Sequence, residues 1–188
     1  MAFGHVQSLT GRRQQWRHSS FGNYYIHSLE DSITSPLAPP SNPPKISYAT
    51  WSPVGSSVAY VSESDLYVVP DAKYVLRVKV YGTVKLRCLL RVPSSFIRAT
   101  YGGNSSYFHG VPDWVYEEEV FANDFALWWS PDGRRITYLS FDETEVDKFD
   151  FPVYNPTDDS SKVHPYPEWV SMRYPKVGHV SPRPGPLQ

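Results

Sequence analysis

The chain has 188 residues, 18 Lys and Arg against 19 Asp and Glu, and a formal net charge of -1. This length suits one ordinary domain with a real core, and the charge balance gives no overall attraction to nucleic acid or to an anionic membrane. No apolar run approaches the roughly 18 residues of a membrane span, and Met1–Arg13 lacks the apolar core of a signal peptide.

Prolines and aromatic residues are both abundant. There are 18 prolines, about twice the average share, and aromatic residues make up 15% of the chain. This combination favours a turn-rich all-β chain over a helical one. The single cysteine, Cys88, permits no internal disulfide.

The first expected strands lie in residues 15–29, where Trp16, Phe21, Tyr24 and Tyr25 are good strand formers. Gly22-Asn23 is predicted to turn a hairpin there. The following loop holds five prolines and cannot join a central strand (Pro36, Pro39, Pro40, Pro43 and Pro44). It is interpreted as a surface connection, with a polyproline ligand for another domain as the alternative.

A strand–turn–strand pattern occurs twice. Trp51-Ser52-Pro53-Val54-Gly55 lies between two expected strands, a third strand follows at 65–69, and Trp-Ser-Pro-Asp-Gly returns at 129–133. Ser, Pro and Gly at positions one, two and four suit a type I turn. Repeated units of this kind are typical of a β-propeller.

Residues 73–96 separate the two copies and alternate apolar with basic residues. They predict a hairpin around Gly82-Thr83, with a basic nucleic-acid stripe as the weaker alternative. Beyond them, Asn104-Ser105-Ser106 is an N-glycosylation sequon in a Gly-rich loop, which favours the secretory pathway.

No catalytic set emerges from the motifs. There is no G-x-S-x-G, H-E-x-x-H, P-loop or G-x-G-x-x-G, and the six histidines have no metal-ligand spacing. We therefore predict no catalytic residue, no metal and no cofactor in this chain.

The stretch Asp113–Phe121 (DWVYEEEVF) places three adjacent carboxylates between aromatic and apolar residues. Asp113 is a good helix N-cap, and glutamates are favoured in a first helical turn. One interpretation is a short solvated acidic helix. The other is a site for a cation such as a peptide ammonium, in which case adjacent glutamates converge only at a helix end or distortion.

The stretch 113–121, preceded by His-Gly-Val-Pro and followed by residues 126–133, resembles the dipeptidyl peptidase IV family of serine exopeptidases, in wording closest to fungal members. The resemblance runs through residues 14–72 and 97–181. Further segments that carry it are Gln15–Ser19, Trp51–Gly55, Phe141–Val146, Phe151–Tyr154 and Tyr174–Lys176.

The resemblance implies an eight-bladed β-propeller of four-stranded blades that caps an α/β-hydrolase domain and releases N-terminal dipeptides with proline or alanine second. Glu118 and Glu119 match the pair that binds the substrate amino group, and Glu117 matches a more structural glutamate. Arg17 matches an arginine that contacts the substrate carbonyl. The family also implies peptide N-termini as partners, homodimers of the full-length protein, and a secreted, vacuolar or type II membrane location.

Three segments depart from the family: 1–13, 73–96 and 182–188. We interpret 73–96 as a non-family insert, such as a translated intron, and the tail as frayed. The resemblance also ends partway through the propeller, without the hydrolase domain. The chain is thus expected to be an inactive recognition fragment. The alternatives are a non-catalytic propeller used for binding or structure, and a non-functional product of a gene model.

Overall fold

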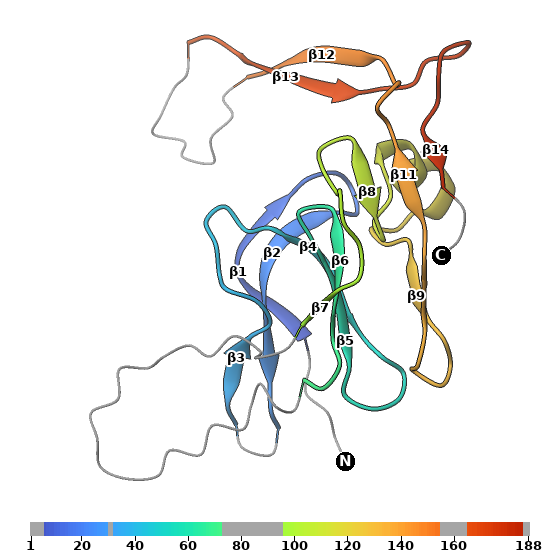
Figure 1. Cartoon of the computed structure of the whole chain (residues 1–188). Coiled ribbons are helices and arrows are strands. Elements are labelled where there is room, and N and C mark those ends of the chain that lie inside the picture. The colour runs from blue at the N-terminus through green and yellow to red at the C-terminus, as the bar shows by residue number, and fades with distance from the viewer. Residues whose placement is uncertain (1–5, 30–31, 73–95, 155–164, 186–188) are drawn as a thin grey trace.

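The computed structural model describes residues 6–29, 32–72, 96–154 and 165–185 (Figure 1). The predicted hairpin at Gly82-Thr83, Cys88 and most of the expected insert lie outside these ranges. Within them the chain is almost entirely β. Its strands are β1 (Val6–Gln14), β2 (Ser20–His27), β3 (Thr34–Pro36), β4 (Ile46–Trp51), β5 (Val58–Ser62), β6 (Asp65–Val69), β7 (Ile97–Arg98), β8 (Tyr107–His109), β9 (Leu127–Trp129), β10 (Ile136–Tyr138), β11 (Ser140–Asp142), β12 (Lys148–Val153), β13 (Glu168–Arg173) and β14 (Arg183–Pro184).

Strands β4 to β7 form an antiparallel meander in chain order, which is the arrangement of one four-stranded propeller blade. Strands β1, β2 and β3 continue the same sheet beyond β4, although β2 meets β4 only at Gly22 and Ile46. A second group contains β9 paired with β10, and β11 between β8 and β14. The predicted all-β partial propeller is confirmed.

Strand β5 carries the core because it is buried on both faces. Val58 and Tyr60 pack with Ile26 and Leu37 on one side, in a cluster that also holds Ile46, Val69 and Ala72. Ala59 and Val61 pack with Leu66 and Leu127 on the other side. Leu127 belongs to β9, in the next group of strands. Side chains of successive residues point to opposite faces of a strand, so β5 joins the two groups face to face.

The repeated Trp-Ser-Pro units fold alike, as expected. Ser52 N donates to Ser57 O at 2.9 Å, and Ser130 N donates to Arg135 O at 2.8 Å, so both six-residue turns close at the same positions. The turns also touch each other: a Cβ placed on Gly133 would lie 2.7 Å from Val54 O. Neighbouring repeats are therefore in contact at their turns.

The predicted turn at Gly22-Asn23 is wrong, because both residues lie inside β2 and the chain reverses at residues 15–19 instead. Gly22 is buried beside Ile46. The Asn23 amide binds the proline-rich loop, with Nδ2 donating to Ser41 O at 3.0 Å and Oδ1 accepting from Ser41 N at 3.1 Å. Gly22 thus lets β2 approach β4 closely, and Asn23 anchors the proline-rich loop.

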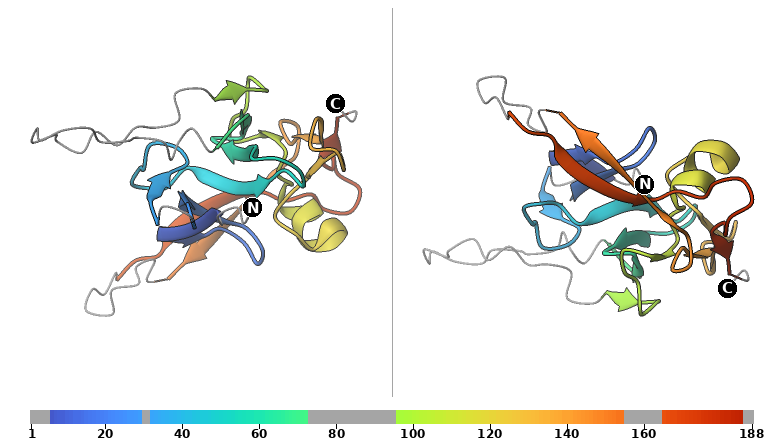
Figure 2. Two further views of the ribbon diagram at one scale, coloured as in Figure 1. Left: turned by 90° about the horizontal axis from the view of Figure 1, so that it is seen from below. Right: turned by 90° about the horizontal axis from the view of Figure 1, so that it is seen from above.

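A two-stranded ribbon, β12 with β13, lies across one end of the molecule, which the two views of Figure 2 show from below and above. The expected fraying of the tail is wrong for residues 183–185. β14 pairs with β11, and Gly185 N donates to Ser140 O at 2.7 Å.

Candidate functional site

The acidic stretch forms a short helix that begins at Asp113. One oxygen of this side chain, Oδ1, accepts from Val115 N at 2.8 Å and from Tyr116 N at 3.1 Å, which confirms the predicted cap. Residues 114 and 115 are α-helical, and η1 (Tyr116–Phe121) continues as a π-helix. Ala122 follows in a left-handed conformation, with φ of 50°, and ends it.

The helix distortion that adjacent glutamates would need is present as a π-helix, although only Glu118 of the pair faces Arg17. A π-helix closes i to i+5 hydrogen bonds and turns through a smaller angle per residue than an α-helix, so neighbouring side chains point in more similar directions. Aromatic contacts hold it against the second strand group: the Tyr116 ring lies 5.0 Å from Phe141, and the Phe121 ring lies 6.3 Å from Trp128. Trp114 packs 4.9 Å from Tyr174, beside the ribbon.

Glu117 is fully buried and binds the turn between β1 and β2. Its Oε1 accepts from the backbone nitrogens of His18 and Ser19, both at 2.9 Å. Burying a carboxylate is costly unless it is hydrogen-bonded, and two charge-assisted bonds to backbone N–H groups meet that requirement. Glu117 thus fastens the turn to the helix.

Glu118 binds the same turn one residue earlier. Its Oε1 accepts from Arg17 N at 3.1 Å. Its Oε2 lies 3.1 Å from the Arg17 guanidinium, close enough for an ion pair but not aligned as a hydrogen bond. The Glu118 side chain is only 6% exposed, whereas that of Arg17 is 74% exposed. The solvated acidic helix is therefore ruled out for Glu117 and Glu118.

Glu119 is exposed, unlike its two neighbours. The structure thus brings Arg17 together with Glu118, which lie 101 residues apart in the chain, and places Glu119 next to them in the sequence with its side chain toward solvent. We call Arg17, Glu118 and Glu119 the acidic clamp. The sequence did not predict that the backbone N–H groups of residues 17–19 would hold the carboxylates of Glu117 and Glu118 in place.

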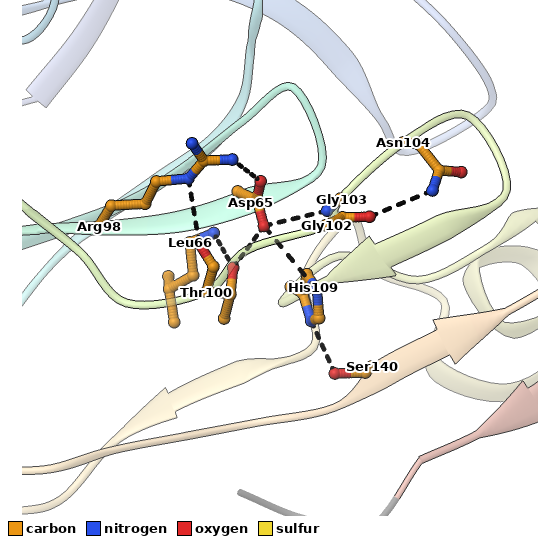
Figure 3. A network of polar contacts seen from close by, with 9 residues as sticks. All are labelled: Asp65, Leu66, Arg98, Thr100, Gly102, Gly103, Asn104, His109 and Ser140. Atoms are coloured by element: carbon orange, nitrogen blue, oxygen red, sulfur yellow. Dashed lines mark hydrogen bonds and ion pairs between the residues drawn. The ribbon is translucent and has the colours of Figure 1, made fainter.

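A buried polar network supports the strand that precedes this helix, and sequence reasoning missed it (Figure 3). Asp65 is 1% exposed and pairs with Arg98 at 2.5 Å, and its Oδ1 accepts from Thr100 Oγ1 at 2.8 Å and Gly103 N at 3.2 Å. Burial would raise the pKa of Asp65, but the hydrogen bonds, chiefly from Arg98, hold it below its usual value. Asp65 therefore stays ionised and ties residues 98–103 to β6.

His109 is the last member of this network, at the end of β8. Its Nδ1 shares a hydrogen bond with Ser140 Oγ at 2.8 Å, and its Nε2 lies 3.8 Å from Asp65 Oδ1 (Figure 3). Burial lowers the pKa of His109, and the nearby Asp65 carboxylate offsets this only in part. A neutral His109 thus links β6 to β11, four residues before the helix cap.

A cavity of about 730 Å³ lies between the 13–19 turn, the start of the helix and the base of the ribbon. Burial raises the pKa of Asp113, against the opposing effect of its two backbone hydrogen bonds. Burial, followed by the charge of Asp113, raises the pKa of Glu143 to about 7. Both carboxyl groups line the cavity, together with the basic side chains of Arg13, Lys45, Lys148 and Arg173.

The sequon residue Asn104 is exposed in an ordered turn. Its Oδ1 accepts from Ser106 N at 2.8 Å, and its Nδ2 donates to Gly102 O at 3.1 Å. Within the described ranges, no three His, Cys, Asp or Glu side chains are arranged to hold a metal ion. In the same ranges, no helix has the length and apolar character needed to cross a bilayer.

One antiparallel meander with a second group of strands packed on it, repeated Trp-Ser-Pro turns and an acidic helix define a β-propeller portion with a cluster of carboxylates on that helix. Residues 5–81 and 91–183 match the family model described as the dipeptidyl peptidase IV (DPP IV) N-terminal region, and the chain belongs to this family. The match begins before residue 14 and leaves out residues 82–90, which lie inside the 73–96 segment.

Similar proteins agree with this family. "Dipeptidyl peptidase 4" of Trichophyton equinum is 41% identical over 174 residues, which is 92% of this chain and 19% of that protein. "Probable dipeptidyl peptidase 4" of Aspergillus flavus is 40% identical over 170 residues, 90% of this chain and 19% of that protein. The chain thus spans about a fifth of the length of these relatives.

Among solved structures, the crystal structure of Porphyromonas gingivalis dipeptidyl peptidase 4 superposes with a TM-score of 0.70 at 24% identity. The superposition covers 93% of this chain and 21% of that one. At this identity the likeness shows the fold, which is the one described above.

Proposed function

We propose that this chain is the substrate-recognition part of a serine-type dipeptidyl peptidase, and that the acidic clamp binds the free amino group of a peptide. The observation that carries this proposal is the contact between Arg17, in the turn between β1 and β2, and Glu118, on the helix that also carries Glu119. A peptide N-terminus is mostly an ammonium at neutral pH, with three N–H donors for such carboxylates.

The clamp also suggests how binding would proceed. The Oε2 of Glu118 is buried and contacts Arg17, so an arriving ammonium has to share or displace the guanidinium. Because most of the Arg17 side chain is exposed, it can move at little cost and then donate to the carbonyl of the bound peptide. The distance from the held ammonium to the scissile bond would let only a dipeptide reach the nucleophile.

We propose that the nucleophile belongs to a hydrolase domain of the dipeptidyl peptidase; the 188 residues themselves contain no G-x-S-x-G motif. Release of dipeptides ending in proline or alanine is accordingly a property we propose for a full-length protein, which we also expect to form homodimers. The 188-residue chain should release nothing from a Gly-Pro reporter. Dipeptide release by the pure chain, abolished by Glu118→Ala, would contradict this division of labour.

Titration calorimetry of the full chain with Gly-Pro-amide tests the clamp. We expect binding that disappears with the acetylated peptide, which has no ammonium, and that weakens about tenfold or more in Glu119→Gln, since a charge-assisted bond is lost. Glu145→Gln, an exposed carboxylate outside the clamp, is the matched control and should bind normally. Equal binding of both peptides would instead favour a general propeller binding module.

We further propose that Asn104 carries an N-linked glycan and that the protein enters the secretory pathway. A glycosylated amide keeps one N–H and its oxygen, so both turn hydrogen bonds of Asn104 can survive the modification. After expression in a eukaryotic secretory host, a glycosidase should shift the electrophoretic mobility of the chain. The shift should vanish in Asn104→Gln and persist in Ser105→Ala, which preserves the sequon.

A further inference from the structure

The N-glycosylation sequon Asn104-Ser105-Ser106 is closed by hydrogen bonds in the folded chain. The Asn104 amide donates from Nδ2 to Gly102 O at 3.1 Å (Figure 3), and its Oδ1 accepts from Ser106 N at 2.8 Å. The backbone closes the same turn, because Asn104 N donates to Tyr107 O at 2.9 Å and the two residues form an isolated β-bridge. Asn104 is thus exposed, but its amide is held within the turn.

Ser106, the hydroxyl residue of the sequon, is held by two later segments of the chain. Its Oγ accepts from Arg173 Nε at 3.1 Å, and its backbone oxygen accepts from Glu143 N at 2.8 Å. Arg173 is itself anchored, because its Nη1 donates to Val146 O at 2.6 Å. Ser106 is half-buried. Its hydroxyl is therefore held in place by an arginine on β13 that lies 67 residues further along the chain.

N-glycosylation requires both of the groups that the fold engages. The transferase joins Asn104 Nδ2 to the first carbon of a sugar carried on a lipid diphosphate; the amide gives up one proton and the lipid diphosphate leaves. A serine or threonine is required two residues after the asparagine, so the enzyme has to recognise that hydroxyl as well. Recognition of Asn104 and Ser106 together requires the closed turn to open, and the reaction rate then follows the population of the open form.

We propose that Asn104 accepts its glycan only while the chain is unfolded or locally open, and that Arg173 closes the sequon once β13 is in place. This inference rests on the proposed glycosylation of Asn104. The folded turn still accepts the product, since the modified amide keeps the oxygen and the one N–H that its two hydrogen bonds use. The fold thus excludes the modification reaction but not the modified residue.

A comparison of folded and unfolded full-length chains tests the proposal. The unmodified parent is incubated with a purified oligosaccharyltransferase and a lipid-linked oligosaccharide, in parallel with Val58→Asp. Val58 is fully buried in β5, so a carboxylate there should keep the chain unfolded without altering the sequon. Circular dichroism checks both states. We expect the unfolded chain to accept the glycan at least about tenfold faster, measured as an initial rate by mass spectrometry.

Arg173→Met tests the residue that closes the sequon. It keeps most of the aliphatic stem and loses the donors, so the folded variant should react about tenfold faster than the parent. Arg134→Met, an exposed arginine in the turn between β9 and β10, is the matched control and should react at the parent rate. Hydrogen exchange of the Ser106 amide in the parent gives a second measurement that needs no variant. Its protection factor should match the factor by which folding slows the reaction.

The possible outcomes separate the closure of the sequon from the glycosylation itself. Equal rates for the folded parent and the unfolded Val58→Asp chain would overturn the closure alone. A folded Arg173→Met chain that reacts at the parent rate, or an unprotected Ser106 amide, would do the same. An unfolded chain that accepts no glycan would overturn both the closure and the glycosylation of Asn104, and would leave the proposed role of the acidic clamp unaffected.

Discussion

Glu117 and Glu118 together bind three successive backbone N–H groups, those of Arg17, His18 and Ser19. Backbone donors at a chain reversal have no strand partner, so an acceptor must come from elsewhere in the molecule. At the scale of single residues, the first glutamate therefore holds the turn in position, and the second both holds the turn and faces the Arg17 guanidinium.

Replacing Glu117 with alanine should destabilise the protein strongly. The change leaves the backbone N–H groups of His18 and Ser19 without their acceptor in a buried site, which should cost about 3 kcal/mol or more. Urea denaturation measures this cost. Exposed Glu119→Ala is the matched control from the same helix and should stay within about 0.5 kcal/mol of the parent. Equal losses in the two variants would show that Glu117 does not hold the turn.

Glu143 should make the protein less stable as the pH rises. Its pKa is raised to about 7 in the folded state, chiefly by burial and next by the charge of Asp113, so the folded state binds more protons than the unfolded state. The stabilisation that this proton provides is complete when the pH lies below the ordinary pKa of glutamate, and it is lost as the pH rises through about 7.

Glu143→Gln removes this titration. Between pH 4 and pH 8, its free energy of unfolding should rise by about 2–3 kcal/mol relative to that of the parent. Unfolding free energies of both proteins at several pH values provide the test. Parallel pH profiles would contradict the assignment of the proton to Glu143.

At the scale of elements, the two Trp-Ser-Pro turns can be compared directly because their glycines occupy the same repeat position. Both have positive φ, 87° at Gly55 and 68° at Gly133, and alanine is strained at either. Only Gly133 faces the neighbouring turn, where a Cβ would approach Val54 O to 2.7 Å, whereas nothing lies within 4 Å of the corresponding position on Gly55.

Gly55→Ala should therefore cost about 1 kcal/mol from backbone strain, and Gly133→Ala about 2–3 kcal/mol because the contact between turns is added. Thermal melts of the two variants measure the difference. If both alanines cost the same, the packing of one repeat turn on the other contributes nothing to stability.

These elements also show what sequence reasoning can predict. The repeated turns and strands β4, β5 and β6 follow from local turn chemistry and alternating side chains, which act over a few residues. The role of Asn23 does not, because its partner Ser41 lies in another loop and the same residue type forms turns elsewhere. The π-helix was beyond reach for a similar reason: 3.6-residue periodicity describes α-helices only.

The candidate site likewise contains some residues whose roles the sequence predicts and others whose roles it does not. Asp113 was predicted as a cap because its bonds lie within three residues. Glu117 was expected to be structural only from the family resemblance, since the turn it binds lies about a hundred residues earlier. The Asp65 network was missed because Asp65, Arg98 and His109 become neighbours only after the sheets assemble.

At the scale of the whole molecule, β5 makes the two strand groups depend on each other. Its side chains alternate between a cluster that includes Ile26 and a cluster that includes Leu127. Burial on both faces means that loss of either cluster exposes apolar surface of the same strand.

Val58→Ala and Val61→Ala, which loosen opposite clusters, should each lower stability by about 1–3 kcal/mol while the molecule still unfolds in one transition. Tryptophan fluorescence and far-ultraviolet circular dichroism should report the same midpoint in both variants. Two separated transitions in either variant would mean that the strand groups fold independently.

The bonds from Glu117 to the 15–19 turn have a consequence for synthesis on the ribosome. His18 leaves the ribosome 99 residues before its acceptor. At ordinary translation rates of 5–20 residues per second, the backbone N–H groups of His18 and Ser19 wait roughly 5–20 s for this carboxylate. The clamp therefore cannot assemble before Glu117 and Glu118 have been translated, and a chain that stops short of them lacks the acceptors for the backbone N–H groups of residues 17–19.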